Sequence, residues 1–144
     1  MGRRRVRLRC ASGDTDMKGV SKLIQELQTI FNAYIRERDK GLPCISCGDP
    51  YPSDAGHLFK KSTRPAMRFN PRACFLQCRK CNSLPDGNYE AMCKGIAQRY
   101  GTDYLTEVIQ TANESRKTDH KWSRSELQEL INYFKSEIKN LKHD

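Results

Sequence analysis

Two short stretches, Cys44-Ile45-Ser46-Cys47 and Cys78-Arg79-Lys80-Cys81, decide the fold of this chain. Each places two thiols three positions apart, so that one tight turn presents both sulfurs to a single ion. Four thiolates satisfy the tetrahedral preference of zinc and leave no vacant position for chemistry. We therefore predict one structural zinc ion, bound by Cys44, Cys47, Cys78 and Cys81.

Other uses of these cysteines are less consistent with the sequence. A disulfide framework fits poorly, because the seven cysteines are an odd number and no secretory signal is apparent. A thioredoxin-like redox pair lacks the accompanying βαβ pattern, and two such pairs in one small domain make coincidence a poor explanation. Iron remains an alternative metal. We expect Cys10, Cys74 and Cys93 to be ordinary small side chains.

Composition narrows the class of protein. The chain has 144 residues, the size of one domain, and only 37% of them are hydrophobic, so a metal cross-link would help its thin core. A net charge of +9 indicates a polyanionic partner, most often nucleic acid, although a basic surface that is merely solvated is the simpler alternative. No apolar run approaches the ~20 residues that span a membrane, so we expect a soluble intracellular protein with no membrane partner.

Apolar side chains recur at spacings of three and four in three segments, which predicts amphipathic helices. The first helix is expected over 17–39, ended by Gly41 and Pro43, and two shorter ones over 88–100 and 102–113. Before them, the arginine-rich residues 1–16 read as a flexible basic arm. The stripe of the first helix consists of Val20, Leu23, Ile24, Leu27, Ile30, Phe31, Tyr34 and Ile35.

The last helix has the clearest start signal. Ser123 and Glu126 form a capping box, and Trp122 is placed to pack on Leu127. Its apolar stripe must pack either on the helix over 17–39 or on a second subunit.

The segment between the cysteine pairs is rich in turn residues and in positive charge. Short strands are expected over 55–59 and 74–77, forming a small hairpin-like element. No base-reading helix or aromatic stacking platform is evident, so recognition of a duplex by its shape is favoured. The basic side chains expected to contact phosphates are Lys60, Lys61, Arg64, Arg68, Arg72, Arg79 and Lys80.

His57 lies between the cysteine pairs, and Asn82 directly follows the second pair. A histidine beside a basic loop is suited to deprotonate water for attack on a phosphodiester, a reaction that also needs a hard divalent cation. Taken alone, a single histidine is more often a packed or exposed side chain than a catalyst.

A set of motifs resembles the phage NinG (Rap) family of recombination proteins, most densely over 28–88. The matching residues are Phe31-Asn32-Ala33-Tyr34-Ile35-Arg36, Cys44-Ile45-Ser46-Cys47-Gly48, Asp54-Ala55-Gly56-His57, Arg64-Pro65, Arg68-Phe69, Gln77-Cys78-Arg79-Lys80-Cys81-Asn82 and Gly87-Asn88. Members of that family are regarded as zinc-containing, HNH-like nucleases of branched DNA, including Holliday junctions.

The resemblance implies a mainly helical α+β fold in which zinc braces a small ββα-metal (HNH-like) element. His57 would be the general base and Asn82 would help to hold Mg²⁺ or Mn²⁺, with Asp54 as a further ligand. The implied organisation is the basic arm 1–16, the NinG-like domain 17–114, and a linker with the C-terminal helix over 115–144.

Two positions depart from the HNH pattern. Gly56 stands where an acidic residue usually precedes the histidine, and Ala73 stands where an asparagine usually ties the two loops of the metal site together. Either catalysis is weakened, or Asn70 substitutes for the missing asparagine.

The leading hypothesis is a structure-selective endonuclease of phage recombination in the cytoplasm of a bacterial host cell. A homodimer would match the near two-fold symmetry of a junction, with the final helix as a candidate interface. The alternatives are a non-catalytic zinc-containing DNA-binding accessory protein and a protein–protein adaptor that uses the final helix.

Overall fold

The computed structural model describes residues 13–115 and 120–143, and α1 (Gly13–Arg38) is its longest helix. This helix begins four residues earlier than the sequence pattern predicts, so Gly13–Asp16 belong to it; the rest of the predicted basic arm lies outside the described residues. Leu27, Phe31 and Ile35 recur every fourth position and are fully buried. The predicted apolar stripe is therefore core.

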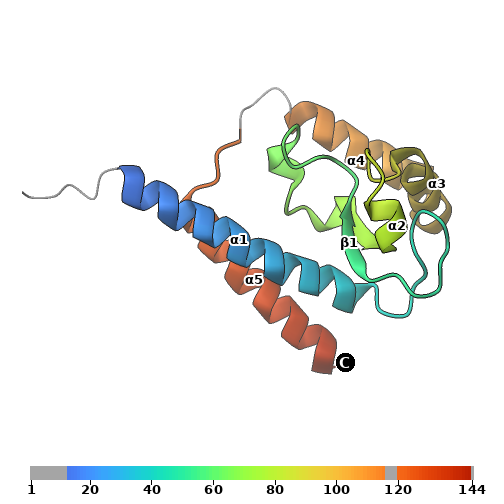
Figure 1. Ribbon diagram of the computed structural model, residues 1–144, viewed down its shortest axis with the longest axis horizontal. Helices are drawn as coiled ribbons and strands as arrows, with labels where there is room; N and C mark the ends of the chain where they lie inside the picture. The colour runs from blue at the N-terminus through green and yellow to red at the C-terminus, as the bar shows by residue number, and fades with distance from the viewer. Residues whose placement is uncertain (1–12, 116–119, 144) are drawn as a thin grey trace, which may run out of the picture.

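The partner of this stripe is α5 (Arg124–His143), which lies alongside α1 (Figure 1). Its residues Leu127, Ile131 and Phe134 are buried, and the ring of Phe134 meets Phe31 edge-on with 5.1 Å between centroids. The buried part of the last helix's apolar stripe therefore packs on α1, the first of its two expected partners.

The predicted capping box of α5 is present. The Ser123 hydroxyl accepts a hydrogen bond from the Glu126 amide at 3.1 Å, and the Glu126 carboxylate accepts one from the Ser123 amide at 3.0 Å. Trp122 packs against the α1–α5 core and meets Phe69 edge-on. The segment before α5 is therefore held against α1, against α5 and against the loop between β1 and β2 that contains Phe69.

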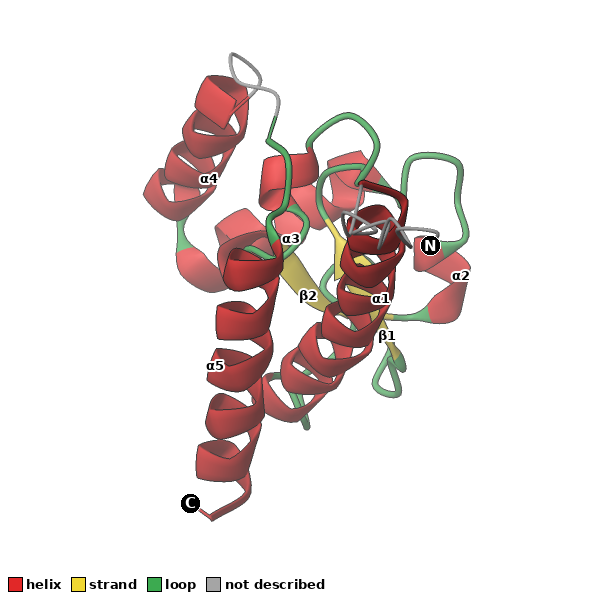
Figure 2. Cartoon of the chain, turned by 90° about the vertical axis from the view of Figure 1, so that its left-hand side faces the viewer, coloured by secondary structure: helices red, strands yellow, loops and turns green. Residues whose placement is uncertain are grey.

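A two-stranded antiparallel sheet lies between the helices (Figure 2). β1 (Asp54–His57) pairs with β2 (Cys74–Gln77), with Asp54 opposite Gln77 and His57 opposite Cys74. The first strand begins one residue earlier and ends two residues earlier than predicted. The connection between the strands contains two single turns of 3-10 helix, η1 (Pro65–Met67) and η2 (Pro71–Ala73).

The remaining helices follow β2 directly. α2 (Arg79–Asn82) is a single turn that contains Cys81, and it is followed by α3 (Tyr89–Tyr100) and α4 (Thr102–Ser115). Gly101, with φ of 98°, ends α3 and separates it from α4. These bounds agree with the predicted helices to within two residues. A second core forms here from Met92, Ile96, Val108 and Ala112 against Ile45, Leu58 and Phe75.

A buried ion pair joins the end of α1 to the sheet. Arg38 binds both carboxylate oxygens of Asp39, and Asp39 accepts a hydrogen bond from the Leu76 amide at 3.0 Å. Arg38 also donates to the carbonyls of Pro71 and Cys74, at 2.6 and 2.7 Å. Because Asp39 is almost fully buried, this network fixes β2 relative to α1.

The architecture is therefore mainly helical α+β, with a small sheet and four clustered cysteines. This confirms the predicted fold class. Over the described ranges, every helix is too short or too polar to cross a membrane.

Candidate zinc centre and adjoining cleft

The four predicted cysteine ligands converge at one point. Their sulfur atoms all lie within 4.8 Å of one another, and the Sγ atoms of Cys47 and Cys78 are 3.6 Å apart. Zinc–sulfur bonds of ~2.3 Å in a tetrahedron place sulfurs roughly 3.8 Å apart, so the cluster fits this metal. Cys44, Cys78 and Cys81 are buried and Cys47 is exposed.

Hydrogen bonds from the chain support the thiolates. The Cys78 amide donates to the Cys44 sulfur at 3.2 Å, and the Asn88 side chain donates to the Cys81 sulfur at 3.4 Å. Burial raises the pKa of Cys44, but amide donors including that of Cys78 outweigh it and bring the pKa down to about 7. Such donors stabilise the anionic form that a metal requires, although at Cys81 burial outweighs the Asn88 hydrogen bond and raises the pKa of the thiol.

The other described cysteines take no part in this cluster. Cys74 is buried on β2, and burial raises the pKa of its thiol; Cys93 is half-buried on α3, and burial raises its pKa too. Both are small core side chains, as expected, and Cys10 lies outside the described residues.

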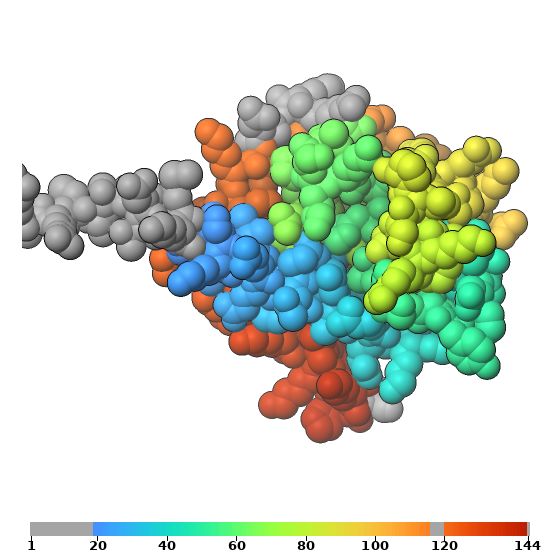
Figure 3. All heavy atoms as spheres, viewed as in Figure 1, coloured from blue at the N-terminus to red at the C-terminus, as the bar shows by residue number. Residues whose placement is uncertain are grey.

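A cleft of about 550 Å³ lies beside the zinc site, and it contains both His57 and Asn82. These residues come from the end of β1 and the end of α2, so tertiary structure brings them into one cleft. Lys60 and Lys61 line the same cleft. In the space-filling view, the green segment after β1 and the yellow-green segment after α2 form one face above α1 (Figure 3).

His57 is held in one orientation. Its Nε2–H donates to the Arg68 carbonyl at 2.9 Å, which leaves Nδ1 unprotonated in the neutral ring. Burial lowers the pKa of His57 to about 4; the hydrogen bond to Arg68 opposes this shift, and the charges of Lys61 and Arg68 reinforce it. The ring is therefore neutral at physiological pH, with one lone pair free to accept a proton.

Asp54 and Asn82 contact each other, but they are placed differently relative to the cleft. The Asn82 amide donates to an Asp54 carboxylate oxygen at 3.2 Å, and Arg79 lies 3.8 Å from the other oxygen. Successive residues of a strand point to opposite faces, so Asp54 faces away from the side that presents His57. Accordingly, Asn82 lines the cleft and Asp54 does not.

The structure gives a physical reason for Gly56 in this position. The fully buried Gln77 side chain crosses over it, and a Cβ added at Gly56 would lie 2.9 Å from the Cβ of Gln77 and collide with its Oε1. Gln77 donates to the Ser46 hydroxyl at 2.9 Å and to the Gly87 carbonyl at 2.8 Å. The space that an acidic side chain would need is therefore occupied by a link between the zinc knuckle and the turn after α2.

Ala73 is buried, and its carbonyl accepts a hydrogen bond from the Leu58 amide at 2.9 Å. Asn70 caps η2 by accepting from the Arg72 amide at 2.9 Å. Asn70 therefore orders the loop that leads to Ala73, while the His57 ring donates its hydrogen bond to the backbone carbonyl of Arg68.

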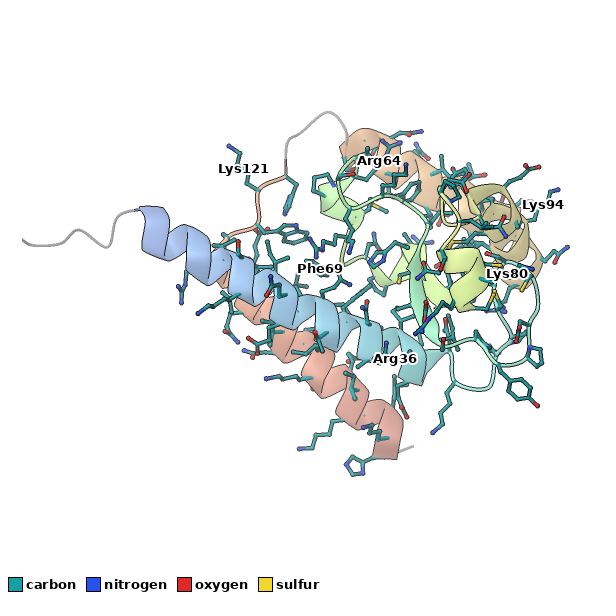
Figure 4. All side chains as sticks on the ribbon, viewed as in Figure 1. Arg36, Arg64, Phe69, Lys80, Lys94 and Lys121 are labelled. Atoms are coloured by element: carbon teal, nitrogen blue, oxygen red, sulfur yellow. The ribbon has the colours of Figure 1, made fainter. Side chains whose placement is uncertain are left out.

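The seven predicted phosphate contacts fall into two groups. Lys60, Lys61, Arg79 and Lys80 are exposed, the first two in the cleft and the others on α2, where Arg79 also lies 3.8 Å from Asp54. The remaining three have partners within the chain: Arg64 bonds Asn113 on α4 (Figure 4), Arg68 bonds Gln28 on α1, and Arg72 pairs with Glu107 on α4.

Comparison with known protein sequences identifies the family of this chain. The family model described as Bacteriophage Lambda NinG protein matches residues 3–144. The chain belongs to the NinG family. Protein ninG of Escherichia phage lambda is 33% identical over 129 residues, which cover 88% of this chain and 61% of that protein. Protein ninG of Salmonella phage P22 is 33% identical over 128 residues, covering 88% and 61%.

Protein ninG of Escherichia phage 933W is similar to the same degree, with 33% identity over 88% of this chain and 62% of its own length. The chain thus spans about three fifths of the length of the curated relatives it matches. No solved structure matches it significantly.

Several residues that shape the site in this NinG-family chain are not evident from sequence patterns. Asp86 lines the cleft and is, in addition to Asp54, a second acidic candidate for a metal ligand. Gln28 and Asn32 form the part of the cleft wall that α1 contributes. Gln77 is the residue among these whose role the sequence indicates, because a buried glutamine at the end of the apolar strand Cys74–Gln77 requires a hydrogen-bond partner.

Proposed function

We propose that this chain is a structure-selective DNA endonuclease that hydrolyses phosphodiesters in branched DNA, such as Holliday junctions, with the help of a divalent cation. The observation that carries the proposal is the shared cleft: His57 and Asn82, 25 positions apart in the sequence, line it together with two lysines. The resemblance to NinG-type, HNH-like nucleases supports the same assignment, as does the chain order β1, β2, α2 around the histidine.

His57 acts as the general base in this mechanism. The Arg68 carbonyl accepts its Nε2–H, so Nδ1 is the atom that accepts a proton from the attacking water. A pKa of about 4 keeps the His57 ring neutral and able to accept a proton, but it also makes the ring a weak base. The water must therefore be made more acidic by other groups in the cleft.

Asn82 and Asp86 are the residues that would hold Mg²⁺ or Mn²⁺. Their fit is chemical, since hard cations prefer carboxylate and amide oxygens. The Asn82 amide nitrogen donates to Asp54, which leaves the Asn82 Oδ1 as the atom that would ligate a cation. When bound, the cation supplies polarisation of the phosphate and acidification of water. Zinc bound by the four cysteines would have no open position, so its role would be to fix the turn that carries Asn82.

Exposed cations around the cleft would position the phosphate backbone. Lys60 and Lys61 flank His57, while Arg79 and Lys80 extend from the first residues of α2. Such contacts orient a duplex without reading its sequence, which suits recognition of a branch by shape.

The test is a nicking assay on four-way junctions and on linear duplexes of the same sequence, with Mg²⁺ or Mn²⁺. His57→Ala is expected to lower the cleavage rate by about 100-fold or more, the usual contribution of a general base. His143→Ala, at the exposed end of α5, is the matched control and should cut normally. Cleavage by His57→Ala at the wild-type rate would refute the mechanism.

A second candidate is a non-catalytic zinc-containing accessory protein that binds branched DNA. It is favoured by the placement of Asp54 outside the cleft and by the absence of a side chain at Gly56, which leave fewer acidic ligands than HNH-like sites usually have. Tight junction binding without cleavage under any divalent cation would select this candidate.

A further inference from the structure

Tyr51 is the most exposed large apolar side chain in the described part of the molecule. Its exposed fraction is 88%, against 52% for Tyr133, the next in rank. Within the described residues, no aromatic ring packs against it. A phenol ring held in water makes no contribution to the core, so both of its faces are available to a binding partner.

The backbone around Tyr51 is restrained, so the ring is presented from a firm base. Pro50 and Pro52 flank it, and each fixes its own φ angle. The Asp49 side chain accepts a hydrogen bond from the Tyr51 amide at 2.8 Å, and the Asp49 carbonyl accepts one from the Cys44 amide at 2.8 Å. The loop is thereby tied to the zinc knuckle, which lowers the entropy cost of ordering it on binding.

Positive charge lies close to this loop. The loop leads directly into β1, whose first residue Asp54 lies 3.8 Å from Arg79. The Arg79 side chain is 82% exposed, and Lys80 beside it is exposed as well. Lys80 and the loop before β1 lie at the same end of the molecule (Figure 4). An aromatic ring with exposed cations nearby is typical of surfaces that bind unpaired nucleotides.

We propose that Tyr51 stacks on an unpaired base at the branch point of a DNA substrate, while Arg79 and Lys80 contact the adjacent phosphates. The proposal rests on the proposed function and adds what selects a branch: bases inside a duplex are already stacked on each other, whereas a branch offers a free base face. Gly48, Asp49 and Ser53, which are near Tyr51 in the sequence, are small or polar and offer little apolar surface to a protein partner.

The test compares forked DNA that has unpaired bases at the fork with a fully paired duplex of equal length, by fluorescence anisotropy at one salt concentration. Tyr51→Ala is expected to weaken fork binding about fivefold to a hundredfold and to leave duplex binding unchanged. Tyr51→Leu keeps apolar bulk without a ring and should show the same loss. Tyr51→Trp should retain fork affinity and quench a 2-aminopurine placed at the unpaired position.

Tyr133→Ala is the matched control, because Tyr133 is a half-exposed tyrosine on α5, and it should bind both probes normally. Zinc content and circular dichroism verify that each variant is folded. Unchanged fork affinity in Tyr51→Ala, or an equal loss on fork and duplex, overturns the stacking proposal. If junction cleavage persists in that case, the proposed function stands; if the wild type binds neither DNA, both fall.

Discussion

The protonation state of His57 gives a quantitative prediction. Its pKa is about 4 in the folded chain, chiefly because of burial, against 6.5 for an unperturbed histidine. Between these values the unfolded chain binds a proton that the folded chain excludes, so stability is lost as pH falls through this window. Above pH 6.5 the contribution is fully present. The whole shift corresponds to about 3 kcal/mol, of which about 2 kcal/mol is lost between pH 7.5 and pH 5.

The assay is urea unfolding of the wild type and of His57→Gln at pH 7.5 and pH 5. The zinc thiolates also protonate in acid, but they do so in both proteins and cancel in the comparison. The wild type should lose about 2 kcal/mol more than the variant over this range. Nitrogen-detected NMR should show His57 as a neutral ring with Nε2 protonated at pH 5. Titration of His57 near 6.5, or equal pH dependence in both proteins, would refute the reasoning.

Three further predictions concern the framework of the site. Chelation of zinc should unfold the sheet and α2, because a structural zinc contributes ~10–16 kcal/mol, as much as the stability of a whole domain. The expected result is a loss of far-UV circular dichroism together with the release of one zinc ion per chain. An unchanged spectrum would contradict this prediction. Gly95→Ala should destabilise the chain by about 1–3 kcal/mol in urea unfolding, because its Cβ would collide with the Ile45 carbonyl oxygen. Gly19→Ala meets only a flexible arginine end and should not destabilise. Asp39→Ala should cost about 3–5 kcal/mol, since Arg38 loses its buried partner; a loss below 1 kcal/mol would argue against the network.

Local patterns in the sequence were sufficient for the elements that depend on near neighbours. The helix bounds follow from apolar spacing and caps, and the Ser123–Glu126 capping box forms as its spacing requires. The four-cysteine cluster was predicted from the two cysteine pairs, because thiols three positions apart can meet one ion, and a tetrahedral zinc site needs both pairs.

Contacts between distant segments could not be predicted from these patterns. The apolar stripe of α5 packs on α1. The sequence does not specify this partner, because an apolar face can be buried by any other apolar surface. The tether of His57 is a backbone carbonyl, which every residue has, so nothing in the sequence marks Arg68 for that role.

The sequence by itself determined the four candidate metal-binding cysteines, the helices, and the positions of His57 and Asn82 between and directly after the cysteine pairs. Only the tertiary structure decided that these two residues share a cleft while Asp54 faces away, that Gln77 fills the space above Gly56, and that Arg64, Arg68 and Arg72 are engaged within the chain. The physical reason is that side-chain direction and pairing depend on strand register and helix packing, which are set by the whole core at once.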